Sequence, residues 1–308
     1  MSVLYKSDPV RGRIWAQVFA EQAPDIEFHI WPDHGDPKRV EYLVAWAPPP
    51  EWIVTFPNVK VLFSSGAGVD QLDLTGVPAH IQVVRMVEPG IVQGVVEYVV
   101  MAVLMLHRRI PEYLRQQAES VWRSGVAVQA SNYRVGVMGL GVLGQAVLQR
   151  LGAFGYRRYG WSRTRKAIAE VATFAGDENL EEFLGCCDIL VCLLPLTEET
   201  RGILDRRVFS GLPRGAALIN AGRGAHLEES AFLDALDTGR LSQAILDVTE
   251  PEPLPCSHPF WTHPRIVLTP HIAGSTQPET AALVLVDNIR RHQRGEPLHD
   301  VIDRFKGY

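Results

Sequence analysis

The sequence predicts an α/β protein with two domains, each built on a doubly wound parallel β-sheet. The chain has 308 residues, which exceeds the usual size of a single hydrophobic core. Short apolar runs alternate with helical stretches or turn signals along most of the chain, as in parallel sheets covered on both faces. A long helical pattern over residues 92–117 interrupts this alternation and separates two series of predicted strands.

The first series consists of short apolar runs separated by turn signals such as Gly35-Asp36-Pro37. The strands predicted here are Val3–Tyr5, Ile26–Ile30, Tyr42–Trp46, Val59–Phe63 and Ile81–Arg85. In the stretch that follows, apolar residues recur at helical spacing from Val95 to Leu106, which predicts one long and mostly buried helix over 92–117.

The second series is nearly continuous in its apolar runs, as expected for strands buried on both faces. The strands predicted here are Arg134–Met138, Tyr156–Trp161, Ile189–Leu194, Ala217–Asn220, Ala244–Val248 and Ile266–Thr269. Helices are predicted over Val142–Leu151, Glu228–Asp237 and Pro278–Arg294. We expect a Rossmann dinucleotide-binding domain at 93–274, and a flavodoxin-like substrate domain formed by 1–92 and 275–308.

Composition narrows the class of protein. A net charge of -5 gives no electrostatic reason to expect nucleic acid or an anionic membrane as partner. The four cysteines lack the spacing of a metal site or a disulfide framework, so no metal is expected. The N-terminus lacks the apolar core of a signal peptide. The longest apolar run, Tyr98–Leu106, is shorter than the ~20 residues that span a bilayer, and we therefore expect a cytoplasmic location.

A glycine-rich turn predicts a dinucleotide site. Gly139, Gly141 and Gly144 form a GxGxxG pattern that follows a buried strand and opens a helix, which is the context that makes the pattern specific. Gly139 permits the tight turn, Gly141 allows backbone to approach a pyrophosphate, and Gly144 lets helix pack on strand. The first helical residues, Val142 and Leu143, offer backbone N–H groups to phosphate.

The end of the next strand indicates which cofactor is bound. NAD sites usually place an acidic residue there for the ribose 2′-hydroxyl, but this chain continues from Trp161 into Ser162, Arg163, a threonine, Arg165 and Lys166. A hydroxyl and several cations suit a 2′-phosphate, which a carboxylate would repel. We therefore expect NADP(H) to be preferred, with NAD(H) possible. The alternative is a solvated basic turn at the start of a helix.

Three further strand ends carry polar residues that suit catalysis. Arg223 follows the strand 217–220, Glu250 and Glu252 follow 244–248, and His271 follows 266–269. Ligands of open α/β sheets bind outside the carboxyl ends of the strands, so we expect these side chains to share one site.

These segments together resemble the D-isomer specific 2-hydroxyacid dehydrogenase family over nearly the whole chain. The resemblance rests on the glycine turn, on Ser65–Asp70, on Leu194–Thr200 and on the arginine, glutamate and histidine segments. Within the family, Trp161–Lys166 and the short length are most similar to bacterial NADPH-dependent glyoxylate/hydroxypyruvate reductases. The resemblance implies reduction of a small 2-keto acid to the D-2-hydroxy acid by hydride transfer, in a homodimer.

The resemblance also implies a catalytic set of Arg223, Glu252 and His271. His271 would be the general acid, since an imidazolium gives up a proton near neutral pH. Glu252 would pair with His271 and hold its orientation, and Arg223 would bind the carboxylate and the carbonyl oxygen with its forked donors. Glu250 and Glu252 both precede proline, and the family spacing favours Glu252.

Other positions carry over from the family as binding residues. Those expected to bind substrate are Trp46, the backbone N–H groups of Ala67 and Gly68, Arg223 and His271. Those expected to contact the cofactor are Gly139, Gly141, Val142, Leu143, Gly144, Trp161, Ser162, Arg163, Arg165, Leu194, Pro195, Thr200, Ala221, Gly222, Asp247 and Gly274. Asp247 would contact the nicotinamide amide. Trp46 would restrict the pocket to small substrates, or would be a packing residue at a strand end.

Alternative functions stay open at this point. A reductase of a bulkier 2-keto acid, or a non-enzymatic cofactor-sensing or corepressor-like protein, could use the same fold. Formate dehydrogenase is disfavoured because that branch has Gln where this chain has Glu252. Phosphoglycerate dehydrogenase is disfavoured by the NADP-type turn and by the lack of a C-terminal regulatory domain.

Overall fold

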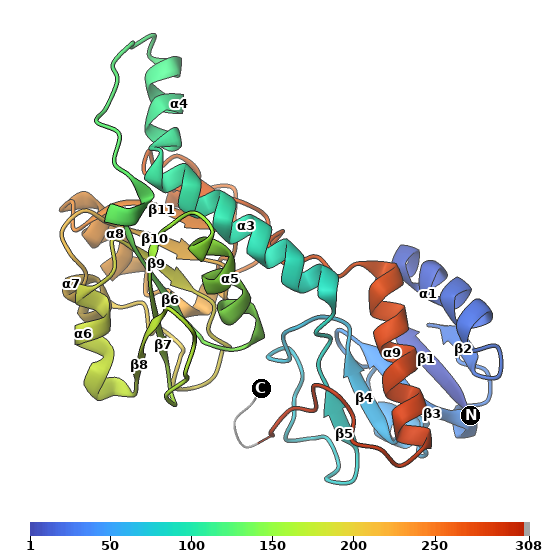
Figure 1. The fold of residues 1–308 in the computed structure, drawn as a ribbon. Helices are drawn as coiled ribbons and strands as arrows, with labels where there is room; N and C mark the ends of the chain where they lie inside the picture. The colour runs from blue at the N-terminus through green and yellow to red at the C-terminus, as the bar shows by residue number, and fades with distance from the viewer. Residues whose placement is uncertain (305–308) are drawn as a thin grey trace. The chain divides into compact units, whose positions relative to one another are not determined.

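The computed structural model describes residues 1–304. The chain folds into two compact units. Unit 1 contains Met1–Ile91 and the C-terminal segment that starts at Ser275, and unit 2 contains Val92–Gly274. Figure 1 shows a β-sheet flanked by helices in each. The predicted fold class, two parallel-sheet α/β units, is confirmed.

In unit 1 the described residues form a parallel sheet of five strands in the order β2-β1-β3-β4-β5. The strands are β1 (Ser2–Lys6), β2 (Glu27–Ile30), β3 (Val40–Ala45), β4 (Val61–Ser64) and β5 (Gln82–Val84). The helices are α1 (Pro9–Gln22), α2 (Trp52–Thr55) and α9 (Pro278–Gln293), with a 3₁₀ turn at Pro37–Arg39.

Side chains alternate across this sheet and build a core on each face. Leu4, Leu43 and Leu62 point to one face and pack with Trp52 of α2. The alternate strand residues point to the other face, which is covered by α1 and α9. There Tyr5 packs on Trp15 of α1, with ring centroids 5.0 Å apart. Both faces of the sheet are therefore buried, which explains the continuous apolar runs in these strands.

In unit 2 the sheet is also parallel, and its order is β12-β11-β10-β9-β6-β7-β8. The strands are β6 (Arg134–Met138), β7 (Arg157–Ser162), β8 (Ala172–Ala175), β9 (Ile189–Cys192), β10 (Ala216–Asn220), β11 (Leu241–Leu246) and β12 (Ile266–Leu268). The helices are α5 (Val142–Gly152), α6 (Leu180–Gly185), α7 (Arg206–Gly211) and α8 (Glu229–Asp237). Short 3₁₀ turns lie at Ala130–Asn132, Asp177–Asn179, Gly224–His226 and Pro259–Trp261.

Helices α6, α7 and α8 cover one face of this sheet and form a buried cluster with strand residues such as Leu190 and Leu218. Helix α5 packs against β6 and β7 on the other face. The apolar pattern does not predict strand β8. It is a four-residue edge strand whose residues are only partly buried, so it lacks the apolar run that marks the central strands.

The prediction of a single helix over 92–117 is wrong in one respect. The structure has two helices, α3 (Pro89–His107) and α4 (Ile110–Ala118), broken where Arg109 takes a left-handed backbone conformation with φ 59°. Pro111 then lies in the first turn of α4, where a missing N–H costs no helical hydrogen bond.

Helix α3 is apolar over a longer stretch than the run Tyr98–Leu106 indicates. Among the described residues it is the one helix long and apolar enough to cross a membrane by length and composition, although half of its most apolar window is buried. The core helix of a globular protein meets the same criterion, so this feature does not assign a location.

Candidate active site

The glycine turn after β6 has the geometry that a dinucleotide site requires. Gly139 has φ +103°, and a Cβ there would lie 2.6 Å from the carbonyl oxygen of Leu193. A Cβ on Gly144 would collide with the carbonyl oxygen of Gly139. Only glycine fits at these two positions, so the turn can bring the start of α5 against the strand.

The space in front of this turn suits a phosphate group. A Cβ added at Gly141 would meet nothing within 4 Å. Gly141 is also the N-cap of α5, where no side chain caps the helix and no acidic residue lies in the first turn. The backbone N–H groups of Val142 and Leu143 begin a helix of 11 residues whose dipole favours an anion here. The residues present therefore fit the pyrophosphate of a dinucleotide.

The end of β7 presents the cationic residues expected for a 2′-phosphate. Trp161 is buried and donates from Nε1 to the carbonyl oxygen of Gly176 at 2.8 Å, which fixes the strand end. The side chains of Arg163, Arg165 and Lys166 are exposed. A loop leads from them to β8, so this basic segment does not start a helix, as the alternative of a solvated basic turn at a helix start expects.

Two further loops lie at the expected cofactor positions. After β9, the carbonyl oxygen of Pro195 accepts a hydrogen bond from Thr200 Oγ1 at 2.7 Å, which closes the loop 195–200. After β10, the N–H of Gly222 donates to Asn220 Oδ1 at 3.2 Å. A side chain at Gly222 would press on the ring of His226, since an added Cβ would lie 3.0 Å from that ring.

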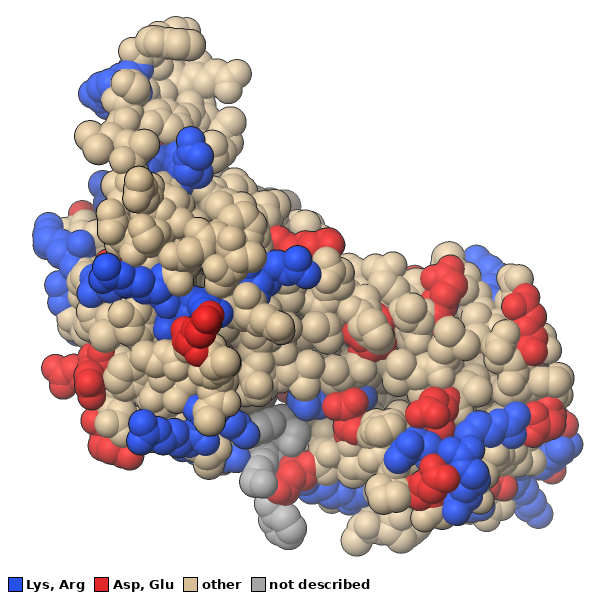
Figure 2. Space-filling model, viewed as in Figure 1, with Lys and Arg blue, Asp and Glu red and all other residues tan. Residues whose placement is uncertain are grey.

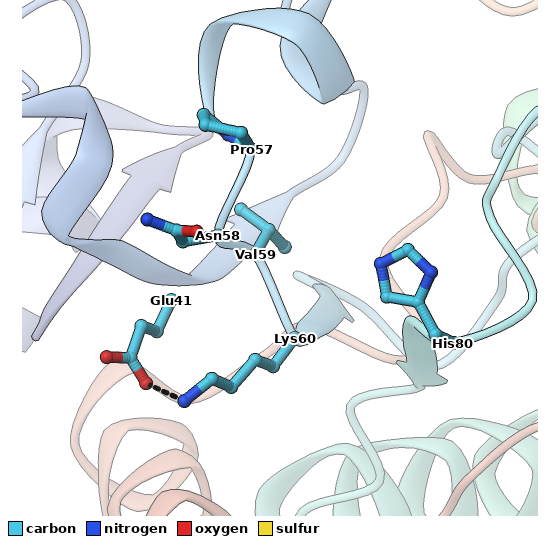
Figure 3. A pocket seen from close by; sticks show the side chains of 6 residues that line it. All are labelled: Glu41, Pro57, Asn58, Val59, Lys60 and His80. Carbon is cyan, nitrogen blue, oxygen red and sulfur yellow. Dashed lines mark hydrogen bonds and ion pairs between the residues drawn. The ribbon is translucent and has the colours of Figure 1, made fainter.

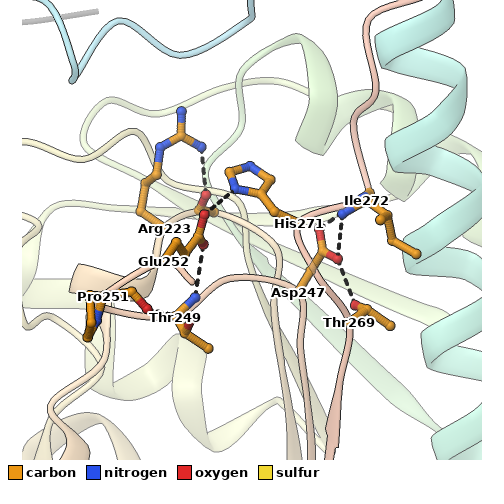
Figure 4. A network of polar contacts seen from close by, with 10 residues as sticks. Arg223, Asp247, Thr249, Pro251, Glu252, Thr269, His271 and Ile272 are labelled. Atoms are coloured by element: carbon orange, nitrogen blue, oxygen red, sulfur yellow. Dashed lines mark hydrogen bonds and ion pairs between the residues drawn. The ribbon is translucent and has the colours of Figure 1, made fainter. Parts of the chain in front are cut away.

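Adjacent strands bring the three catalytic candidates to one edge of the sheet. Arg223 follows β10, Glu252 follows β11 and His271 follows β12, and these strands are neighbours in the order β12-β11-β10. Because the strands are parallel, all three carboxyl ends lie at the same edge. Figure 4 shows the three side chains grouped there.

Glu252 and His271 form a direct pair. His271 Nδ1 lies 2.8 Å from Glu252 Oε2, while Glu252 Oε1 accepts from the N–H of Thr249 at 3.0 Å. An ionised carboxylate only accepts, so Nδ1 carries the proton and Nε2 is the ring nitrogen presented to a reactant. The structure thus places Glu252 against the imidazole, while Glu250 lies on the exposed loop before it.

Asp247 holds the backbone turn that carries His271. It is 2% exposed. Its carboxylate accepts hydrogen bonds from Thr269 Oγ1 at 2.7 Å and from the N–H groups of Ile272 at 2.9 Å and Ala273 at 2.8 Å. The turn needs this support because His271 has φ 55°, which is unfavourable for a residue with a side chain.

The network extends to a residue that the sequence did not single out. Tyr98 of α3 lies with its hydroxyl 2.5 Å from Thr269 Oγ1. Burial raises the pKa of Tyr98 to about 12, so its hydroxyl stays protonated. The contact joins residues 171 positions apart, and no local pattern marks it.

Arg223 is held by its own turn. Its Nη1 donates to the carbonyl oxygen of Gly222 at 2.8 Å, and its own carbonyl oxygen accepts from Asn220 Nδ2 at 3.0 Å. The side chain is partly buried, and its guanidinium lies beside Glu252 in Figure 4. A guanidinium in this position offers forked donors suited to a carboxylate.

In unit 1, the loop after β4 carries the residues expected to bind a substrate carboxylate. Ser64 Oγ donates to the carbonyl oxygen of Gly68 at 2.8 Å and accepts from the N–H of Gly66 at 3.3 Å, which curls the loop around Ala67. Trp46 follows β3, and its ring lies over Gly66, where an added Cβ would be 3.0 Å away. The indole packs on this loop yet stays 43% exposed.

A separate hollow in unit 1 contains none of the expected site residues. Its volume is about 360 Å³, and Lys60 and Glu41, which both line it, form an ion pair at 2.6 Å. Figure 3 shows the lining residues Glu41, Pro57, Asn58, Val59, Lys60 and His80. Its lining therefore pairs the positive charge of Lys60 with the negative charge of Glu41.

Charge and metal-ligand patterns of the described residues add no other site. Within residues 1–304 no group of three or more His, Cys, Asp or Glu is placed to hold a metal ion. Figure 2 shows basic and acidic side chains interspersed over the face that it draws.

Comparison with known proteins supplies close relatives. The family model described as D-isomer specific 2-hydroxyacid dehydrogenase, NAD binding domain, matches residues 100–273. A glyoxylate/hydroxypyruvate reductase A of Serratia proteamaculans is 38% identical, over 100% of both chains.

Solved structures are similar along the whole chain. A D-isomer specific 2-hydroxyacid dehydrogenase from Xanthobacter autotrophicus, in complex with NADPH and MES, has a TM-score of 0.96 and 38% identity over 100% of this chain and 99% of that one. An NADPH-dependent glyoxylate/hydroxypyruvate reductase from Sinorhizobium meliloti, in complex with NADP and sulfate, has a TM-score of 0.93 and 34% identity over 100% of both chains.

Proposed function

Because the chain belongs to the D-isomer specific 2-hydroxyacid dehydrogenase family, we propose that it reduces glyoxylate, hydroxypyruvate or a similarly small 2-keto acid with NADPH. The product is the 2-hydroxy acid, of D configuration where it is chiral. The observation that carries this proposal is the pair of His271 Nδ1 and Glu252 Oε2, 2.8 Å apart, at the strand ends that also present Arg223. That pair provides a proton donor beside an anion-binding guanidinium.

Each member of the set has one role in the reaction. NADPH, when bound, supplies the hydride that adds to the carbonyl carbon. His271 donates the proton on Nε2 to the carbonyl oxygen as negative charge develops there. Glu252 holds the ring through Nδ1 and stabilises its cationic form. Arg223 binds the substrate carboxylate and polarises the carbonyl.

The cofactor is NADP(H) in preference to NAD(H). The glycine turn and the start of α5 suit the pyrophosphate, and the exposed Arg163 and Arg165 at the end of β7 suit the 2′-phosphate. The relatives solved with NADPH and NADP support the same preference. NAD(H) lacks the 2′-phosphate and would bind more weakly.

For the substrate carboxylate we propose a second set of donors, the backbone N–H groups of Ala67 and Gly68. The support is the curled loop that Ser64 closes. Trp46, packed on Gly66 and partly exposed, would restrict substrates to small side chains.

The direct test is oxidation of NADPH by the purified chain with glyoxylate, hydroxypyruvate, pyruvate and phenylpyruvate. We expect the highest kcat/KM with glyoxylate or hydroxypyruvate. Preference for phenylpyruvate would favour the reductase of bulkier keto acids. No turnover with any of them by folded protein would contradict the enzyme proposal and favour a cofactor-sensing protein.

We propose further that the chain forms a homodimer through the segment that begins with α4. This segment, residues 110–131, projects from unit 2 in Figure 1. It carries apolar side chains in solvent, with Trp122 at 102% exposure and Val126 at 84%. Monomers rarely leave such side chains together in water, and a second copy would bury them symmetrically.

Replacing Trp122 and Val126 by Ser should shift the sedimentation coefficient from that of a dimer to that of a monomer. Val54→Ser, at a valine as exposed as Val126, should not change it.

A cytoplasmic location is proposed on the state of the cysteines. Cys187 and Cys192 are free and buried, and burial raises the pKa of both thiols. Free thiols of this kind are typical of a reducing compartment.

A further inference from the structure

A buried histidine lies directly behind the catalytic arginine. His226 ends the 3₁₀ turn Gly224–His226 and is 0% exposed. Its Nδ1 lies 3.1 Å from the backbone nitrogen of Arg223, and its Nε2 lies 3.2 Å from the carbonyl oxygen of Pro195. The ring therefore touches both the arginine turn and the loop expected to contact the cofactor.

The two contacts determine which ring nitrogen is protonated. The N–H of Arg223 can only donate, so Nδ1 must present a lone pair. The carbonyl of Pro195 can only accept, so Nε2 must carry the hydrogen. Cys192 Sγ lies 3.7 Å from Nδ1, and burial raises the pKa of that thiol to about 12, so it too faces the ring as a neutral S–H group.

We propose that His226, as the neutral tautomer protonated at Nε2, is a positioning residue that fixes the backbone of Arg223 against the cofactor loop at Pro195. This inference rests on the proposed function, because Arg223 is the carboxylate anchor there. One nitrogen orients the substrate-binding residue, and the other restrains the loop 195–200, which Thr200 also closes through the same carbonyl oxygen.

The backbone around His226 reinforces this connection. The N–H of Leu204 donates to the carbonyl oxygen of His226 at 2.9 Å, and the N–H of Gly202 donates to that of Ala225 at 2.9 Å. The main chain thus fixes the turn 224–226 to residues 202–204, and the His226 ring fixes the same turn to the loop 195–200.

Two amide substitutions separate the two contacts. His226→Asn keeps an oxygen where Nδ1 lies and loses the donor to Pro195. His226→Gln keeps an N–H where Nε2 lies and loses the acceptor for Arg223. We expect the Gln variant to lower kcat/KM for glyoxylate about tenfold while the Kd for NADPH changes less than about twofold. The Asn variant should show the reverse, with a weaker NADPH Kd and a smaller change in kcat/KM.

A purely structural role would not produce this crossed result. If both folded variants change kcat/KM and Kd in the same proportion, or if neither changes either one, the positioning role is contradicted. Melting curves and circular dichroism of each variant establish the folded state.

A measurement on the unaltered chain keeps the inference testable if the variants fail to fold. NMR of protein labelled with ¹⁵N in the histidine rings distinguishes the tautomers. We expect His226 to be protonated at Nε2 alone at neutral pH, and protonation at Nδ1 would overturn the inference. This readout needs no turnover, so it stays informative even if the chain does not reduce glyoxylate.

Discussion

The catalytic strand ends and the basic turn after β7 lie on one sheet but are built in opposite ways. At the catalytic ends, Asp247 is buried with three hydrogen bonds and Glu252 is held by the N–H of Thr249 before any substrate arrives. After β7, the side chains of Arg163 and Arg165 extend into solvent. The catalytic ends are held by hydrogen bonds to a buried carboxylate, whereas the cationic side chains after β7 are exposed.

The difference follows from what each region must do. Proton donation depends on placing His271 within hydrogen-bond reach of the carbonyl oxygen, and a displacement of about 1 Å can cost about 100-fold in rate. Recognition of a 2′-phosphate depends mainly on charge, which exposed cations can supply from several positions. We therefore expect substitutions in the fixed region to affect kcat, and substitutions in the exposed region to affect cofactor affinity.

The largest effect is expected from His271→Ala. The variant lacks the proton donor but keeps the glycine turn, so kcat should fall by about 10²- to 10⁴-fold while the Kd for NADPH stays within about twofold. Steady-state kinetics and fluorescence titration measure the two quantities. His299→Ala, at an exposed histidine of unit 1, is the control and should behave as the unaltered chain. Loss of NADPH binding with retained turnover would refute the assigned role.

A smaller effect should follow from Glu252→Gln, which keeps the size of the side chain but removes its charge. Without the carboxylate the cationic form of His271 loses its partner, and kcat/KM should fall roughly tenfold or more. The matched variant Glu250→Gln changes the same residue type two positions earlier on the exposed loop and should have almost no effect. Equal losses in both variants would show that Glu252 has no special place beside the imidazole.

The smallest effect on turnover should come from Arg163→Ala. Loss of one charge-assisted contact should weaken NADPH about 10- to 100-fold and leave NADH almost unchanged. Arg157→Ala is the matched control, because Arg157 is an exposed cation at the opposite end of the same strand. If NADPH and NADH weaken to the same extent, the residue does not contact the 2′-phosphate.

How far the sequence could predict this molecule depends on the range of each interaction. Apolar runs predict the buried central strands, and for strand β6 the predicted bounds match the observed ones, Arg134–Met138. The edge strand Ala172–Ala175 was not predicted because partial burial leaves a mixed composition. The break at Arg109 was missed because a proline two residues later is compatible with either a kink or a new helix start.

The residues of the site divide in the same way, into those that local sequence predicts and those that depend on distant contacts. Strand-end positions identified Arg223, Glu252 and His271, because parallel strands bring their carboxyl ends to one edge. The support from Tyr98 could not be anticipated, since it depends on a contact across 171 residues. No motif of the sequence marks His226, and only the structure shows its two ring nitrogens against Arg223 and the loop after β9.

The central claim is that the chain transfers a hydride to the carbonyl carbon of a small 2-keto acid while His271 supplies the proton. The most direct measurement uses glyoxylate with NADPH deuterated at C4 of the nicotinamide, in separate reactions with the 4R and the 4S isomer, followed by mass spectrometry of the product. With one of the two isomers the glycolate should carry deuterium on C2. Glycolate without deuterium from both isomers, or no glycolate at all, would contradict the claim.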